Sequence, residues 1–237
     1  MTKPARRLWD GTSAALAAVF QYLGAWLSLG LAGAIGALVF FSWLASEMLE
    51  GETRAFDEAI RTFVHNHASP TLTTIMQLVT LLGSVMWLSV LGVCVAVAFV
   101  MAKWWRDVAL FIVTMAGGIV LNITLKLSFG RARPDAFFET PQPSSYSFPS
   151  GHALLSLCFY GALAAIITSR LHSRTTRFLI WTAAALLVAI IGFSRIYLGV
   201  HFPTDVLASY AVALAWVVIV SAFDNLHRKR DWSRSRR

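Results

Sequence analysis

The chain has 237 residues and a formal net charge of +8, and 57% of its residues are hydrophobic whereas only 14% are charged. A soluble domain would carry about 25% charged residues, so this composition excludes an ordinary soluble protein and predicts one embedded in a membrane. The positive charge could indicate nucleic-acid binding, but no nucleic-acid-binding motif accompanies it, and we expect no nucleic-acid partner.

The charged residues are segregated, and long stretches of the chain lack Asp, Glu, Lys and Arg. These stretches are Gly11–Ser46, Ala68–Ala102, Val108–Leu125, Ala153–Ser169, Phe178–Ser194 and Val206–Phe223. A helix needs about 20 residues to cross the hydrocarbon core, with about 17 as the lower limit. Every stretch reaches that limit, so the sequence predicts an all-α, polytopic membrane protein with a six-transmembrane-helix bundle. No second domain is evident, and residues 1–237 are expected to form one integral membrane domain.

The first uncharged stretch is longer than one membrane crossing requires. We expect Thr12–Tyr22 to lie along the membrane interface and a first span to run from about Leu23 to Ala45. The segment Glu47–His67 then lies outside the membrane, and its apolar residues recur at helical spacing. This pattern predicts a short amphipathic helix that rests on the membrane surface.

The second span is expected to begin at Ser69-Pro70, where serine caps the helix and proline occupies its first turn. This span runs to about Ala102 with a bend near Gly83, and Lys103–Asp107 then forms a tight turn. The third span ends at Lys126.

The connection Ser128–Ser150 is rich in proline, glycine and serine, which predicts an ordered loop rather than a helix. The fourth span is expected at Gly151–Ser169, and the fifth span ends near Ser194. The segment Arg195–Phe202 caps the fifth span, and the sixth begins around Pro203, a first-turn proline.

The Lys and Arg residues are distributed unevenly between the two sides of this layout. Most of the 20 lie in the N-terminal segment, in the connections after the second and fourth spans, and in the C-terminal tail. The positive-inside rule therefore predicts a multi-pass protein of the inner (cytoplasmic) membrane with both termini in the cytoplasm. The ends of the spans near Lys126, Gly151 and Ser194 then face the extracytoplasmic side.

Three polar motifs lie at those extracytoplasmic ends. They are Lys126 with Arg133-Pro134, then Pro149-Ser150-Gly151-His152, and then Ser194-Arg195 with His201 and Asp205. Ionisable groups beside hydrocarbon are costly, so they persist mainly where they pair with one another or serve a function. Their joint occurrence predicts a site at the membrane–water boundary that binds a phosphate and transfers it.

The residue types of the motifs fit phosphoryl transfer. A phosphoryl group in transfer carries charge on three oxygens, so catalysis depends on positioning and on cationic stabilisation. Lys126, Arg133 and Arg195 can supply that positive charge. Ser150 and Gly151 lie where a loop becomes a helix, and free backbone N–H groups and the helix dipole favour an anion there.

Two histidines and a carboxylate complete the set. His201 and Asp205 are neighbours on one helix face if the sixth helix begins early enough to include both. A carboxylate on one imidazole nitrogen fixes the tautomer and frees the other nitrogen to attack phosphorus. His152 is then left to protonate the departing oxygen and later to activate water. The motifs contain no carboxylate cluster, so we expect no metal and no cofactor. Arg131 lies between the defining positions of the first motif and is expected only to contact headgroups.

The motifs resemble the signatures of the type 2 phosphatidic acid phosphatase superfamily, which are KxxxxxxRP, PSGH and SRxxxxxHxxxD. That superfamily includes bacterial membrane lipid phosphatases and vanadium haloperoxidases. The resemblance covers Lys126–Asp205 and holds at every defining position. It implies general acid catalysis by His152, a phosphohistidine at His201 that Asp205 orients, and phosphate binding by Lys126, Arg133, Ser150, Gly151 and Arg195.

The leading hypothesis is therefore a metal-independent hydrolase that cleaves a lipid phosphate monoester or diphosphate within the membrane. Phosphatidylglycerol phosphate, phosphatidate, undecaprenyl diphosphate and lipid A 1-phosphate all stay open as substrates, with Glu47–His67 and Asp135–Ser147 as the segments expected to select the headgroup. One alternative is a vanadate-dependent haloperoxidase-like enzyme, which the predicted spans argue against. The other is a non-enzymatic lipid-phosphate transporter, which would favour broken helices or paired repeats. The oligomeric state stays open.

Overall fold

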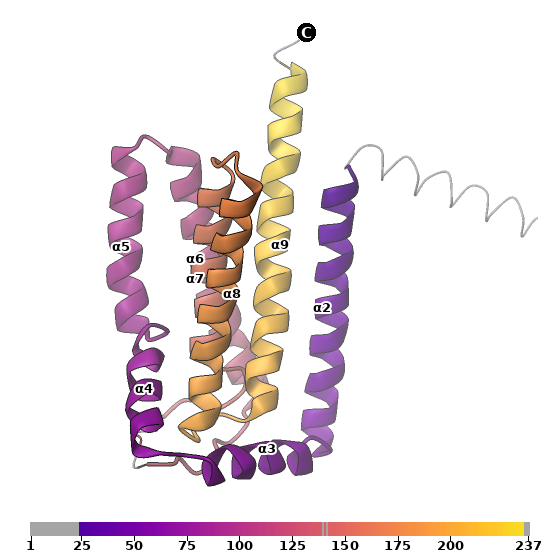
Figure 1. The fold of residues 1–237 in the computed structure, drawn as a ribbon. Helices are drawn as coiled ribbons and strands as arrows, with labels where there is room; N and C mark the ends of the chain where they lie inside the picture. The colour runs from indigo at the N-terminus through magenta and orange to yellow at the C-terminus, as the bar shows by residue number, and fades with distance from the viewer. Residues whose placement is uncertain (1–23, 139, 141, 235–237) are drawn as a thin grey trace, which may run out of the picture.

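The computed structural model describes residues 24–138, 140 and 142–234, and that part of the chain contains α-helices and no strand (Figure 1). The helices are α2 (Ala25–Glu50), α3 (Arg54–Asn66), α4 (Pro70–Leu81), α5 (Val85–Met101), α6 (Trp105–Phe129), α7 (Gly151–Thr168), α8 (Arg174–Tyr197) and α9 (Pro203–Arg234). The all-α prediction is confirmed. The expected interfacial segment Thr12–Tyr22 lies outside the described residues.

The described helices include 5 that are long and apolar enough to cross a membrane, and the bent pair α4–α5 provides a sixth span if it counts as one. The predicted polytopic bundle is therefore confirmed, with one of its spans broken. The axes of α4 and α5 differ by 46° at the break. The spans run alternately up and down, so successive connections lie at opposite ends of the bundle (Figure 1).

The bend in the second span lies where the sequence predicts it, at Gly83. Backbone groups freed by a break inside a membrane need new partners. The hydroxyl of Tyr160 donates a hydrogen bond of 2.9 Å to the carbonyl of Leu82, and the side chain of Ser84 caps α5. A Cβ at Gly83 would lie 2.5 Å from Ile191 Cγ2, so only glycine lets the two helices approach this closely.

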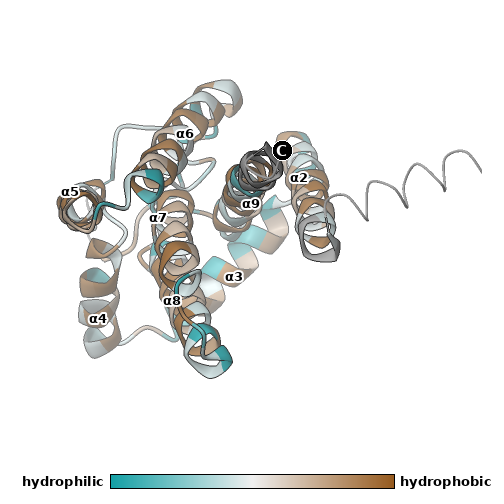
Figure 2. Ribbon diagram, turned by 90° about the horizontal axis from the view of Figure 1, so that it is seen from above, coloured by the Kyte–Doolittle hydropathy of each residue, from teal (hydrophilic) through white to brown (hydrophobic). Residues whose placement is uncertain are grey.

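Helix α7 is the centre of the bundle. It packs against α6, α8 and α9, and its side chains form half of the main hydrophobic core, including the fully buried Leu154, Cys158 and Phe159. Figure 2 shows α7 between α6 and α8, with α4 and α5 on one side and α9 on the other. Helix α2 stands at the edge and packs mainly on α9. A residue at the start of α7 therefore lies inside the bundle rather than facing lipid.

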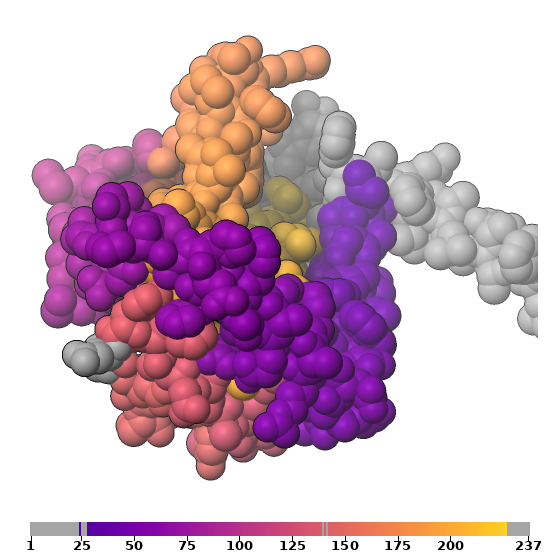
Figure 3. Space-filling model, turned by 60° about the horizontal axis from the view of Figure 1, so that its bottom comes forward, coloured from indigo at the N-terminus to yellow at the C-terminus, as the bar shows by residue number. Residues whose placement is uncertain are grey.

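Helix α3 crosses one end of the bundle instead of spanning it (Figures 1 and 3). Its Phe56 and Phe63 side chains are exposed, whereas Asp57 and Arg61 are 0% and 4% exposed. The predicted short helix is thus present, but its buried face is polar. Such a face can be buried only where the rest of the protein supplies partners for its charges.

Helix α8 extends one turn beyond its predicted end at Ser194. Tyr197 is buried, and its hydroxyl lies 2.9 Å from Thr73 Oγ1 and accepts a hydrogen bond from the backbone N–H of Ser69. These contacts tie the end of α8 to the start of α4 and hold the last turn in helical form. The prediction that Arg195 belongs to a capping segment is therefore wrong, because Arg195 lies in the last helical turn.

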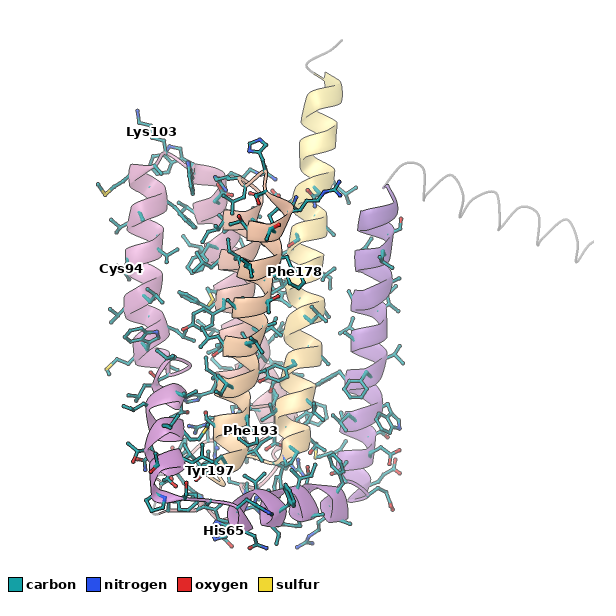
Figure 4. All side chains as sticks on the ribbon, in the orientation of Figure 1. His65, Cys94, Lys103, Phe178, Phe193 and Tyr197 are labelled. Carbon is teal, nitrogen blue, oxygen red and sulfur yellow. The ribbon has the colours of Figure 1, made fainter. Side chains whose placement is uncertain are left out.

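Partly exposed ion pairs close the opposite end of the bundle, where Figure 4 labels Lys103 far from Tyr197 and His65. Asp107 of α6 pairs with Arg170 in the connection after α7, and Arg106 pairs with Asp224 of α9. The Arg170 guanidinium also lies 3.7 Å from the centre of the Trp104 ring. These contacts connect α6, α7 and α9 at the end that carries the basic connections.

Candidate active site

The three motifs meet at the end of the bundle that α3 crosses. Lys126 and Arg195 lie in the last turns of α6 and α8, and Ser150 is the N-cap of α7. His201 lies in the connection between α8 and α9. Because these helices alternate in direction, residues far apart in the sequence reach the same end of the molecule.

His201 and Asp205 are in contact, although not as neighbours on a regular helix face. Helix α9 begins at Pro203, so His201 precedes it. The two side chains are 2% and 0% exposed, and His201 Nδ1 lies 3.2 Å from Asp205 Oδ2. Asp205 is the third helical residue, and its carboxylate reaches back to accept the N–H of Phe202 at 2.9 Å. This is one half of an N-terminal capping box, the bond from the third helical residue back to the N-cap, and it aims the carboxylate toward the preceding loop.

The contacts of His201 define its tautomer. Asp205 accepts at Nδ1, so that nitrogen carries the proton, while Arg133 Nη1 lies 3.1 Å from Nε2 and can only donate. The lone pair of Nε2 therefore faces Arg133 of the first motif. A nucleophile needs an available lone pair, and this one points toward the groups that would hold an anion.

Burial lowers the pKa of His201 from its ordinary 6.5 to about 4, although the Asp205 carboxylate acts in the opposite direction. The imidazole is thus uncharged near neutral pH, which a nucleophilic histidine requires. Burial also lowers the pKa of Arg133, but arginine is so strongly basic that the guanidinium keeps its charge.

Two cations of the first motif are held by the loop that leads to α7. Arg133 Nε donates to the carbonyl of Ser145 at 2.7 Å, and Arg133 Nη1 donates to the carbonyl of Val200 at 2.9 Å. The ammonium group of Lys126 donates to the carbonyl of Tyr146. These contacts fix Arg133 beside His201, and Lys126 within electrostatic range of Arg133, without neutralising either cation, because carbonyl oxygens carry no formal charge.

Ser150 and Arg195 each keep a buried polar atom without a partner in the protein. Ser150 is the N-cap of α7, yet its side chain makes no capping hydrogen bond, and its Oγ is unpaired. Arg195 is 5% exposed, and its Nε is unpaired. Buried polar atoms without partners are uncommon outside functional sites. A serine hydroxyl, a guanidinium and a helix N-terminus are groups that bind an anion.

His152 lies in the first turn of α7, within electrostatic range of Lys126, Arg133, Arg195 and His201. The fold therefore brings together the residues that the sequence singled out, from four helices and two of the connections between them. The roles of these residues in catalysis and phosphate binding stay predictions.

The structure adds Thr80, which the sequence did not indicate. Arg195 Nη1 donates a hydrogen bond of 2.6 Å to Thr80 Oγ1, one helical turn before the break between α4 and α5. The contact fixes the guanidinium at the end of α8. No short motif surrounds Thr80, so only the packing of α4 on α8 could reveal its position.

Arg131 also lies elsewhere than expected. Its guanidinium is 13% exposed and pairs with Asp205 Oδ1 at 2.6 Å and with Asp57 Oδ2 at 2.7 Å. The expectation that it only contacts headgroups is therefore wrong, because two buried carboxylates hold it inside the protein. Asp57 belongs to α3, and nothing in its local sequence distinguished it from the exposed acidic residues around it.

Comparisons with known proteins identify the family. The sequence model of the PAP2 superfamily matches residues 107–229. Phosphatidylglycerophosphatase B of Bacillus subtilis (strain 168) is 32% identical over 192 residues, which cover 80% of this chain and 94% of that protein. An undecaprenyl-diphosphatase of Sulfolobus acidocaldarius is 28% identical over 156 residues, which cover 61% of this chain and 71% of that protein.

The fold agrees with the sequence. The crystal structure of the transmembrane PAP2 type phosphatidylglycerolphosphate phosphatase from Bacillus subtilis matches with a TM-score of 0.75 at 32% identity. The match covers 81% of this chain and 95% of that chain. Because the similarity extends over nearly the whole of a relative and includes both the helical bundle and the motifs, this protein is a membrane-embedded member of the PAP2 superfamily.

Proposed function

We propose that the protein is an integral membrane phosphatase that removes phosphate from a lipid through a phosphohistidine intermediate. One observation carries the proposal: a buried His201 presents Nε2 toward Arg133 while Asp205 holds its Nδ1. A neutral imidazole in a fixed tautomer beside several cations suits nucleophilic attack on phosphorus better than it suits simple anion binding.

The proposed reaction has two steps. His201 Nε2 attacks phosphorus, an N–P bond forms, and the P–O bond to the lipid breaks as His152 gives a proton to the departing oxygen. His152, now neutral, takes a proton from water, and the resulting hydroxide displaces His201 and releases inorganic phosphate. Asp205 stabilises the imidazole while it carries positive charge. Lys126, Arg133, Ser150, Gly151 and Arg195 hold the phosphoryl oxygens, as the superfamily motifs imply.

The substrate class follows from the position of the site at the end of the spans, where a headgroup can reach the cations while its tail stays in lipid. Among the open candidates, phosphatidylglycerol phosphate is the first to test. The reason is that this chain is similar to a phosphatidylglycerophosphatase over 94% of the length of that protein. A cavity of about 680 Å³ is lined by both segments expected to select the headgroup, with Arg54, His65 and Asp135 among its residues. This cavity supports a role for both segments in substrate choice.

The alternatives have less support. A haloperoxidase-like enzyme does not account for the membrane spans or for the similarity to lipid phosphatases. The break between α4 and α5 is a feature expected of a transporter, but the contact of the adjacent Thr80 with Arg195 supports a role for this region in the proposed phosphate site.

Phosphate release by the purified protein tests the proposed function. We expect turnover of at least one of the four lipid phosphates in detergent with excess chelator present, because cations from the protein replace a metal. Vanadate should inhibit, since its five-coordinate form resembles the transition state. Phosphate release would be measured with and without magnesium for each lipid. Activity that appears only after magnesium is restored would contradict the metal-independent mechanism, and no release from any of the lipids would contradict the function.

We also propose that the site faces the extracytoplasmic side of the inner membrane, with both termini in the cytoplasm. The basic connections lie at the end of the bundle opposite the motifs, where Arg106 and Arg170 form their ion pairs. The positive-inside rule assigns that end to the cytoplasm. A phosphatase in this orientation acts on lipids of the outer leaflet.

Thiol labelling of intact cells tests this orientation. Ser144 and His172 are both exposed and lie at opposite ends of the bundle. A cysteine at Ser144 should react with an impermeant maleimide from outside, whereas one at His172 should react only after the cells are opened. The unmodified protein, whose Cys94 and Cys158 lie within α5 and α7, measures the background. The reverse pattern would place the site in the cytoplasm.

A further inference from the structure

A buried polar network joins the interfacial helix α3 to the candidate nucleophile. Its members are Asp57 of α3, Arg131 of the first motif, and Thr204 and Asp205 of α9. Asp57 and Asp205 are 0% exposed and Thr204 is 1% exposed. Buried charges are stable only when they are paired and hydrogen-bonded. The members of this network are therefore held in one geometry, because any other would leave a buried charge unpaired.

Asp57 caps α9 from outside that helix. The residue at the N-cap position of α9 is Phe202, whose side chain has no acceptor for the free N–H groups of the first turn. Asp57 Oδ1 accepts the N–H of Thr204 at 3.0 Å, and Oδ2 accepts the Thr204 hydroxyl at 2.7 Å. A carboxylate at this position also complements the helix dipole. The start of α9, which carries Asp205, is therefore held by a residue of α3.

Arg131 bridges the two carboxylates. Its Nη2 binds Asp57 and its Nη1 binds both Asp205 Oδ1 and Thr204 Oγ1, at 2.8 Å for the threonine. The guanidinium also lies 4.0 Å from the centre of the Phe202 ring. Planar arginine suits such a bridge, and lysine could not make the same contacts.

The bridge leaves one oxygen of Asp205 for His201. Because Arg131 holds Oδ1, the carboxylate cannot rotate, and Oδ2 stays on His201 Nδ1 together with the Ser147 hydroxyl and the Phe202 N–H. The orientation of the imidazole thus depends on a residue that never touches it.

We propose that Asp57 and Arg131 are positioning residues for the His201–Asp205 pair, which makes α3 a part of the catalytic apparatus rather than only a surface helix. This inference rests on the proposed phosphatase function. In metal sites, residues that orient a ligand through a hydrogen bond typically contribute about 10–100-fold in affinity or activity, and we expect an effect of that size for the orientation of His201.

The charge of Arg131 adds a second effect that a purely structural role would lack. The charged groups that act on His201 are Asp205 of α9, Arg133 of the motif loop and Arg195 of α8. The titratable His152 of α7 lies within electrostatic range of it. Arg131 weakens the attraction of Asp205 for a protonated imidazole. Its removal should raise the pKa of His201, so that activity is lost at a higher pH as the solution is acidified.

The experiment compares Arg131→Ala, Arg131→Lys and Asp57→Asn in the full chain, purified in detergent. For Arg131→Ala we expect kcat to fall by about 100-fold with little change in KM, and the acid limb of the pH profile to move up by about 1 unit. Arg131→Lys keeps the charge but not the bridge, so kcat should fall while the acid limb stays in place. Asp57→Asn should lower kcat by about 10-fold without moving the acid limb upward.

Arg170→Ala is the control, because it breaks a partly buried Arg–Asp pair at the far end of the bundle. It should lower the melting temperature and leave the pH profile unchanged. Rates are corrected for the folded fraction, so misfolding of one variant does not decide the result. The inference would be overturned if the Arg131→Ala protein kept kcat within about threefold of wild type. It would also be overturned if the acid limb of its pH profile lay at the same pH as in the Arg170→Ala protein. A wild-type protein without phosphatase activity would instead overturn the proposed function.

Discussion

His201→Ala is expected to abolish both turnover and the covalent phosphoenzyme. If His201 forms the N–P bond, we expect no other group in the site to replace it, because His152 lies at the start of α7 and the Asp205 carboxylate is bound by Arg131. Removal of a catalytic nucleophile lowers kcat by on the order of 10⁶-fold in other enzymes that act through covalent intermediates. The residual rate should therefore be indistinguishable from that of buffer containing the lipid alone.

The measurement combines steady-state phosphate release with trapping of radiolabelled phosphate on the protein. Quenching in alkali preserves the N–P bond of phosphohistidine, which acid would hydrolyse. Asp205→Asn should still form the phosphoenzyme but turn over about 10²–10⁴-fold more slowly, because the imidazole loses its fixed tautomer. His172→Ala, at the opposite end of the bundle, is the histidine control and should behave as wild type. A labelled phosphoenzyme in His201→Ala would show that another residue is the nucleophile.

The arrangement of spans could be predicted from the sequence because hydrocarbon imposes simple rules. A stretch without charges must be a helix of about 20 residues, and proline, glycine and serine mark where helices begin, bend and end. The bend at Gly83 and the start of α9 at Pro203 follow from those rules. The end of α8 does not, because the contacts of Tyr197 with α4 extend it beyond Ser194.

The candidate site was predictable only in part. Its motif residues stand out because charges beside hydrocarbon are unusual. Thr80, Asp57 and the bridge formed by Arg131 do not stand out, since their importance comes from contacts with residues far away in the sequence. The two partners in these contacts are separated by 115, 147 and 74 positions, respectively. An acidic residue in an amphipathic helix is normally exposed, and only the packed structure shows that α3 turns Asp57 inward.

His152→Ala should separate substrates by the basicity of their leaving group. A lipid phosphate monoester releases an alkoxide, which is strongly basic and needs a proton as the P–O bond breaks. p-Nitrophenyl phosphate releases a weakly basic phenolate that needs little protonation. Loss of a general acid typically costs about 10²–10⁴-fold, so we expect a loss of this size for the lipid and about tenfold or less for the first turnover of the nitrophenyl ester.

Steady-state rates alone would hide this difference, because His152 is also proposed to activate the water that hydrolyses the phosphohistidine. In His152→Ala that second step should be slow for every substrate, since the same intermediate forms from each. Nitrophenol should therefore appear in a rapid burst of about one equivalent per enzyme, followed by slow turnover, and the phosphoenzyme should accumulate. Stopped-flow absorbance and alkaline quenching measure the two events separately. Equal losses in the first turnover of both substrates, or the absence of a burst with the nitrophenyl ester, would remove His152 from the role of general acid and leave it as an anion-binding group at the start of α7.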